Sequence, residues 1–69
     1  MKLSARNVIK AKVKKVVEGA VNSEITVVLA GGDEMVSIIT KTSAKNLGIK
    51  KGKEVYVVVK ASNVMLGVD

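Results

Sequence analysis

Three short segments carry the hydroxyls, backbone amides and fixed positive charges that could hold a small anion: Ser4, Ala5 and Arg6; Thr40 and Ser43; and Lys60, Ala61 and Ser62. The first contains the only arginine, the second lies at the start of an expected short helix, and the third ends an expected strand. Amides at a helix start favour negative charge. An anion leaves water at tolerable cost when each oxygen finds a donor, so convergence of the segments predicts an anion site.

Each of these residues also has an ordinary structural role. Ser43 can cap a helix, Ser62 can belong to a turn, and Lys60 can lie along the surface with its ammonium in water. The binding hypothesis therefore depends on the segments meeting in the folded protein.

The composition excludes several other chemistries. The 69 residues contain no His and no Cys, which excludes zinc, haem and iron-sulfur ligation, Ser-His or Cys-His catalysis and disulfides. The remaining acids form no catalytic constellation, and the adjacent Asp33 and Glu34 are best explained as exposed turn residues. We expect a protein that is not an enzyme and that ligates no metal directly.

The net charge of +6 raises the alternative of a nucleic-acid-binding module. Single-stranded nucleic acid is usually held by stacking on aromatic side chains, and Tyr56 is the only aromatic residue. Lys10, Lys12 and Lys14 share one face of a predicted strand, where they form either a phosphate-binding stripe or a solvated face that protects a sheet edge. We favour the solvated face and expect no nucleic-acid partner.

The elements that must position these residues are mostly β. Val, Ile and Thr make up 22 of the 69 residues, and alternating apolar positions predict strands over 5–17, 24–30, 34–40 and 53–60, with a short last strand over 64–66. Gly31 and Gly32 predict a hairpin, and residues 42–48 predict one or two helical turns ended by Gly48. The element order predicts an all-β fold, a small five-stranded OB-like Greek-key barrel with one short helix between strands three and four.

The chain length predicts one domain, residues 1–69, with a core too small to be stable without a supplement. Because disulfides and metal sites are excluded and 48% of the residues are apolar, we expect a homo-oligomer. The apolar runs are too short to span a bilayer, and the N-terminus lacks the apolar stretch of a secretory signal. We expect a cytoplasmic protein with no membrane partner.

The same segments also carry a family resemblance. The N-terminal Ser4-Ala5-Arg6-Asn7, the run Val-Ser-Ile-Ile-Thr40, the turn Leu47-Gly48-Ile-Lys-Lys-Gly52 and the segment Val-Lys60-Ala-Ser62-Asn-Val-Met65 together resemble the molbindins, the Mop-type molybdate-binding proteins. The likeness covers essentially the whole chain, as a single copy of the module.

This resemblance implies a homohexamer, a trimer of dimers, that binds molybdate or tungstate at subunit interfaces and stores or buffers the oxyanion in the cytoplasm. The first kind of site would use Ser4, Arg6, Lys60, Ala61 and Ser62 of one subunit with Thr40 and Ser43 of another. A second kind of site maps to Gly19, Ala20, Val21 and Asn22. A molybdopterin ligand is the family's other association, but a pterin ring would need an aromatic or deep apolar pocket, for which the sequence offers only Tyr56.

Overall fold

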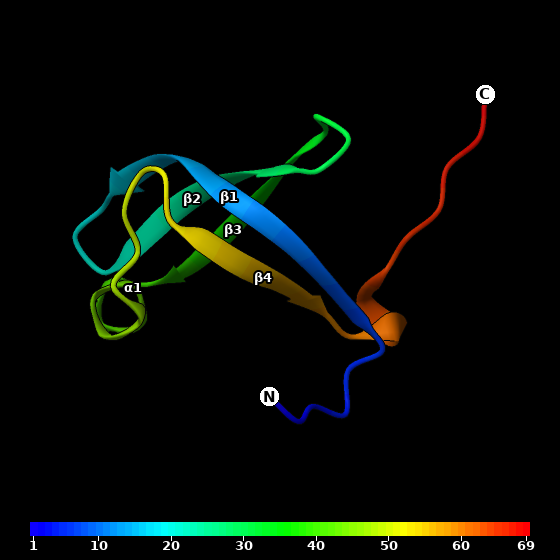
Figure 1. Ribbon diagram of the computed structural model, residues 1–69, viewed down its shortest axis with the longest axis horizontal. Helices are drawn as coiled ribbons and strands as arrows, with labels where there is room; N and C mark the ends of the chain where they lie inside the picture. The colour runs from blue at the N-terminus through cyan, green and yellow to red at the C-terminus, as the bar shows by residue number, and fades with distance from the viewer.

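The computed structural model describes all 69 residues. In chain order, the elements are β1 (Asn7–Glu18), β2 (Asn22–Leu29), β3 (Glu34–Thr40), α1 (Lys41–Leu47), β4 (Glu54–Val59) and a 3-10 turn, η1 (Ala61–Asn63) (Figure 1). The four long predicted strands and the helix between the third and the fourth are therefore confirmed. No helix combines the length and the hydropathy needed to cross a bilayer.

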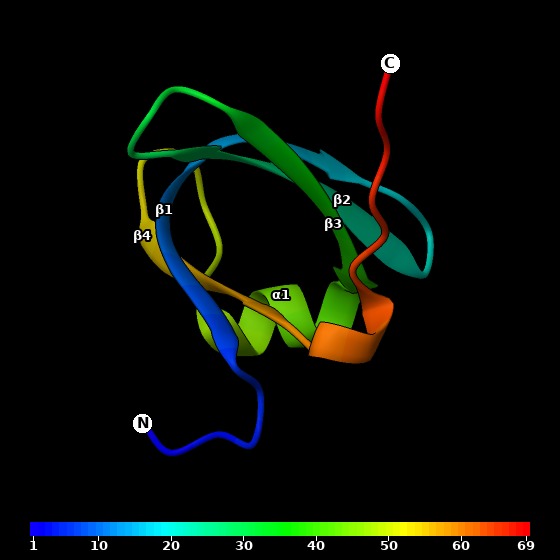
Figure 2. The same cartoon turned by 90° about the vertical axis from the view of Figure 1, so that its right-hand side faces the viewer.

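The strands form one antiparallel sheet in the order β3-β2-β1-β4. The sheet curls strongly, as Figure 2 shows, and gives the OB-like arrangement that the element order predicts. Its two edge strands, β3 and β4, do not pair with each other, so the barrel stays open on that side.

The concave face of the sheet carries the core, as strand alternation predicts. Ala11 and Val13 of β1 and Ile25 and Val27 of β2 are buried, and apolar side chains of β3 and β4 pack against them. The pairing of β1 with β2 shifts between Val13 and Lys15. This irregularity leaves Lys14 outside the ladder and bends the strand, which helps the sheet to curl.

Two glycines have the roles predicted for them in the hairpin turn and at the end of the helix. Gly32 adopts a positive φ of 95° in the hairpin between β2 and β3, and Gly48 caps α1 in the left-handed conformation. The helix cap is Thr40, whose side chain accepts a hydrogen bond from the Ser43 amide, so α1 begins one residue earlier than the predicted 42–48 segment.

The predicted fifth strand over residues 64–66 is wrong for the single chain. The η1 turn redirects the backbone away from the sheet, and the last residues run outward with no strand to pair with (Figure 1). Met65 is 91% exposed and Leu66 is 95% exposed. The apolar alternation of this segment predicts extended backbone, but a strand also needs a free sheet edge within reach.

The core is small, as the length predicts. Only six of 69 residues are buried, while many large apolar side chains lie on the surface. An apolar cleft of about 510 Å³ opens between the edge strands, with Met35, Ile39, Val55 and Val57 among its lining residues. An exposed apolar surface of this kind is typical of an interaction surface.

Candidate oxyanion-binding site

The first and third donor segments meet at one end of the sheet. Asn7 pairs with Val59 as the last rung between β1 and β4, so residues 4–6 and residues 60–62 leave the sheet side by side (Figure 1). Ala5 is half-buried, and the other five residues are exposed. We call this set, Ser4, Ala5, Arg6, Lys60, Ala61 and Ser62, the cationic end.

The charges and amides of the cationic end remain available. The structure contains two ion pairs, Lys10 with Glu54 and Lys14 with Glu34, and neither involves Arg6 or Lys60. The η1 turn uses the amides of Asn63 and Val64 as its donors, to Lys60 O at 2.9 Å and Ala61 O at 3.3 Å. The first amides of a helical turn have no partner within it, which leaves those of Ala61 and Ser62 for a ligand.

The second donor segment lies where β3 becomes α1. The Thr40 hydroxyl accepts a hydrogen bond from the Ser43 amide at 3.0 Å and donates one to Ser43 Oγ at 2.8 Å. Thr40 therefore has the capping role, while the Ser43 hydroxyl keeps its own proton free to donate. Both residues are exposed.

The connection between β1 and β2 lies beside this helix start. Asn22 is the register partner of Thr40, and the Lys41 amide donates to Val21 O at 2.8 Å. The Gly19 amide closes the connection by donating to Asn22 O at 2.8 Å, so Gly19 itself has no free amide. We call this set, Gly19, Ala20, Val21, Asn22, Thr40 and Ser43, the hydroxyl end.

One chain does not bring the two ends together. Figure 1 shows α1 and η1 at opposite ends of the sheet. The cationic end has both fixed charges and two of the hydroxyls, whereas the hydroxyl end has neither Arg6 nor Lys60. A ligand that contacts residues of both ends must therefore lie between two copies of the chain.

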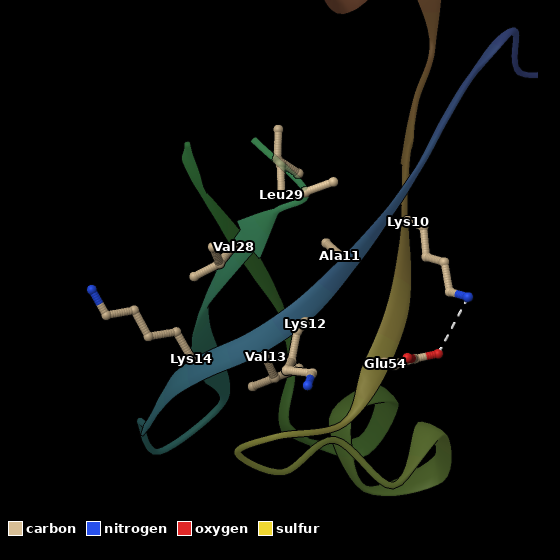
Figure 3. A pocket seen from close by; sticks show the side chains of 9 residues that line it. Lys10, Ala11, Lys12, Val13, Lys14, Val28, Leu29 and Glu54 are labelled. Carbon is tan, nitrogen blue, oxygen red and sulfur yellow. Dashed lines mark ion pairs between the residues drawn. The ribbon is translucent and has the colours of Figure 1, made fainter. Parts of the chain in front are cut away.

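The lysines of β1 do not form an uninterrupted basic stripe. Lys10 Nζ lies 3.4 Å from Glu54 Oε2 (Figure 3). Lys14 pairs with Glu34, so Lys12 lies between two lysines that each have a carboxylate partner. The structure corrects one part of the prediction, because β1 is a central strand and its lysines cannot protect an edge. Alternating ion pairs fit a solvated face better than a phosphate-binding stripe.

One buried polar residue was not among the predicted site residues. Ser23 is 1% exposed, and its hydroxyl has no hydrogen-bond partner. The alternation of β2 could have revealed it, because Ile25 and Val27 point inward and Ser23 lies two residues before Ile25. It follows the hydroxyl end directly along the chain. No cluster of three or more acidic or metal-ligating side chains could hold a metal ion.

Comparisons with known proteins fit this architecture. Residues 3–66 match the TOBE domain family. The chain is 44% identical over 66 residues to molybdenum-pterin-binding protein 3 of Clostridium pasteurianum, covering 96% of this chain and 97% of the relative. It is 39% identical over its whole length to a probable molybdenum-pterin-binding protein of Haemophilus influenzae, whose whole length is also covered.

Solved structures of similar proteins superpose closely on this chain. MopII of Clostridium pasteurianum superposes with a TM-score of 0.92 at 40% identity, over 97% of this chain and all of that one. The cytoplasmic molybdate-binding protein ModG, solved with molybdate bound, superposes with a TM-score of 0.95 at 48% identity, over all of this chain and 49% of ModG. The chain therefore belongs to the TOBE-domain family, as a member of its Mop type, the molbindins.

Proposed function

We propose that the protein binds molybdate and tungstate between copies of itself, and so stores or buffers these oxyanions in the cytoplasm. The observation that carries this proposal is the pairing of Asn7 with Val59, which places the only arginine beside Lys60 and the open amides of η1. The names of the relatives, which describe molybdenum and molybdate binding, support the choice of ion.

The cationic end supplies the charge. Molybdate is a tetrahedral dianion, so two fixed positive charges, from Arg6 and Lys60, offset its charge. The hydroxyls of Ser4 and Ser62 and the amides of the η1 turn donate to its oxygens. The metal is held through its oxygens alone, which fits a chain without His or Cys.

The hydroxyl end of a second copy completes the first kind of site. The Ser43 hydroxyl donates to the oxyanion, and Thr40 holds that hydroxyl in place through their 2.8 Å hydrogen bond. A second kind of site uses the connection that Gly19, Ala20, Val21 and Asn22 form. There the amides of Ala20 and Val21 are the donors, because the Gly19 amide is already used.

Self-association follows from the apolar surface that one chain leaves uncovered. The tail from Val64 to Val68 and the cleft between β3 and β4 are both apolar, and within one chain the tail runs away from the sheet (Figure 1). The tail of one copy covering the cleft of another would bury both. Such an exchange, repeated in a homohexamer built as a trimer of dimers, brings cationic and hydroxyl ends of different copies together.

The proposed site selects ligands by size and charge. Sulfate has the same charge and shape as molybdate but shorter bonds to oxygen, so cavity size discriminates against it, while tungstate binds like molybdate. We expect no catalysis, because the acidic residues form no catalytic group. We also expect no nucleic-acid partner and no molybdopterin, because Tyr56 is the only aromatic residue and we assign the apolar cleft that it lines to the tail.

Isothermal titration with molybdate, tungstate and sulfate tests the proposal. We expect saturable heat at micromolar concentrations of the first two ions and none with sulfate. Absence of heat with molybdate, together with binding of a single-stranded oligonucleotide, would favour the nucleic-acid alternative. Binding of molybdopterin without binding of free molybdate would make the pterin the ligand.

A further inference from the structure

A basic groove lies apart from both donor ends. It has a volume of about 500 Å³ and is lined by four lysines, one glutamate and two apolar residues: Lys14, Lys15, Lys50, Lys51, Glu18, Val16 and Ile49. None of these residues belongs to the cationic or the hydroxyl end. We call it the lysine groove.

The backbone holds the two walls of the lysine groove together. One wall is the irregular part of β1, and the other is the loop between α1 and β4, which runs against that strand in Figure 1. The Val13 amide donates to Lys53 O at 2.9 Å, and the Gly52 amide donates to Val13 O at 2.8 Å. Gly52 has a φ of 90°, a backbone conformation that glycine adopts without strain, and this lets the loop turn back against β1. The lysines are therefore gathered by the fold rather than by chance rotamers.

The positive charge of the groove is mostly uncompensated. Lys14 pairs with Glu34, but Lys15, Lys50 and Lys51 form no ion pair. Like charges that line one groove repel one another, which lowers stability unless a negatively charged partner offsets the repulsion. The oxyanion site proposed above does not use them.

We propose that the lysine groove docks an acidic segment of a partner protein, in which apolar side chains alternate with carboxylates. Charge complementarity selects the acidic residues and steers the encounter. The half-buried Val16 and Ile49 offer apolar contact between the lysines. Nucleic acid fits less well, because Glu18 would face its phosphates and the groove has no aromatic residue on which a base could stack.

The test uses the full-length protein and the K50A/K51A variant. The probe is a fluorescein-labelled peptide of alternating Glu and Leu, followed by anisotropy at low salt, with a DNA duplex of equal charge as the competing probe. The matched control is K12A/K45A, which removes the same charge outside the groove. We expect the peptide to bind the K50A/K51A variant about tenfold more weakly than the unmodified protein. The control should change the affinity by less than about twofold, and high salt should abolish binding.

Three outcomes would overturn the proposal. The peptide fails to bind the unmodified protein; the control weakens peptide binding as much as K50A/K51A does, which leaves only diffuse charge; or the duplex binds more tightly than the peptide and is the probe that K50A/K51A weakens. Molybdate titration of the same variants keeps the two proposals separate, because both variants should retain oxyanion binding.

Discussion

The two ends of the sheet contribute different chemistry. The cationic end has Arg6, Lys60 and the open amides of η1, which the last rung between β1 and β4, Asn7 with Val59, holds together. The hydroxyl end offers hydroxyls and amides around Thr40, which its own cap interactions keep in place. The cationic end has both fixed charges, the hydroxyl end has neither, and one chain keeps the two ends apart. The oxyanion site that we propose combines them across two copies of the chain.

The largest expected effect comes from separating the copies. Substituting Met65→Asp with Leu66→Asp puts two carboxylates on the apolar tail, where each native side chain would gain about 1.5–3 kcal/mol on burial in a partner's cleft. We expect assembly, and oxyanion binding with it, to be lost, as measured by sedimentation and titration. The control, Ala30→Asp with Gly31→Asp, adds the same charges at the exposed hairpin between β2 and β3. A fully assembled tail variant would contradict the exchange.

The next effect comes from the cationic end. Arg6→Ala removes a charged donor worth about 1.5–3 kcal/mol, so molybdate affinity should fall about ten- to hundredfold in titration. Lys12→Ala is the matched control, because Lys12 is an exposed cation of β1 outside both ends. Equal losses in the two variants would mean that only the overall charge attracts the ion.

The backbone of the hydroxyl end gives a stability test. A Cβ at Gly19 would lie 2.7 Å from Asn22 O, so Gly19→Ala forces the connection to shift and should lower the free energy of unfolding by about 1–3 kcal/mol. Gly31→Ala is the control, since a Cβ there meets nothing within 4 Å. Denaturant unfolding compares the two, and equal stability would show that the connection is not rigid.

The smallest effect is expected from a single hydroxyl. Ser43→Ala should weaken molybdate binding about three- to tenfold, the loss of one neutral hydrogen bond of about 0.5–1.5 kcal/mol. The Thr40 cap of the Ser43 amide survives, so stability should barely change. Thr42→Ala, which removes a neighbouring hydroxyl on the same helix, should leave affinity unchanged in the same titration. An effect at Thr42 but not at Ser43 would reassign the donor.

The strand pattern predicted most of the fold. Apolar alternation over residues 5–17 and 24–30 predicted strands with one apolar face, and Ala11, Val13, Ile25 and Val27 on those faces are buried. Gly48 correctly predicted the end of the helix, because the C-cap has a left-handed backbone conformation that glycine adopts readily. The prediction of a fifth strand was wrong for the single chain, because the η1 turn directs residues 64–66 away from both free sheet edges. No local sequence pattern specifies which edge an apolar segment reaches.

The candidate site could be predicted only in part. The residue types identified the donors, but they did not show which donors lie together. Arg6 lies beside Lys60 because of the register between β1 and β4, and Asn22 lies beside Thr40 because of the register between β2 and β3. Register joins residues that are far apart in sequence, so the separation into two ends became visible only in the folded chain. The prediction that both ends contribute to one site remains to be tested.

Subunit complementation tests that central claim most directly. Arg6→Ala chains have a defective cationic end, and Ser43→Asp chains have a hydroxyl end that repels anions. Equal amounts of both variants are unfolded, refolded together and titrated with molybdate. If the two ends of a site come from different copies, about a quarter of the sites in the mixture pair an intact cationic end with an intact hydroxyl end and bind with normal affinity. A mixture in which no normal sites return would contradict the account.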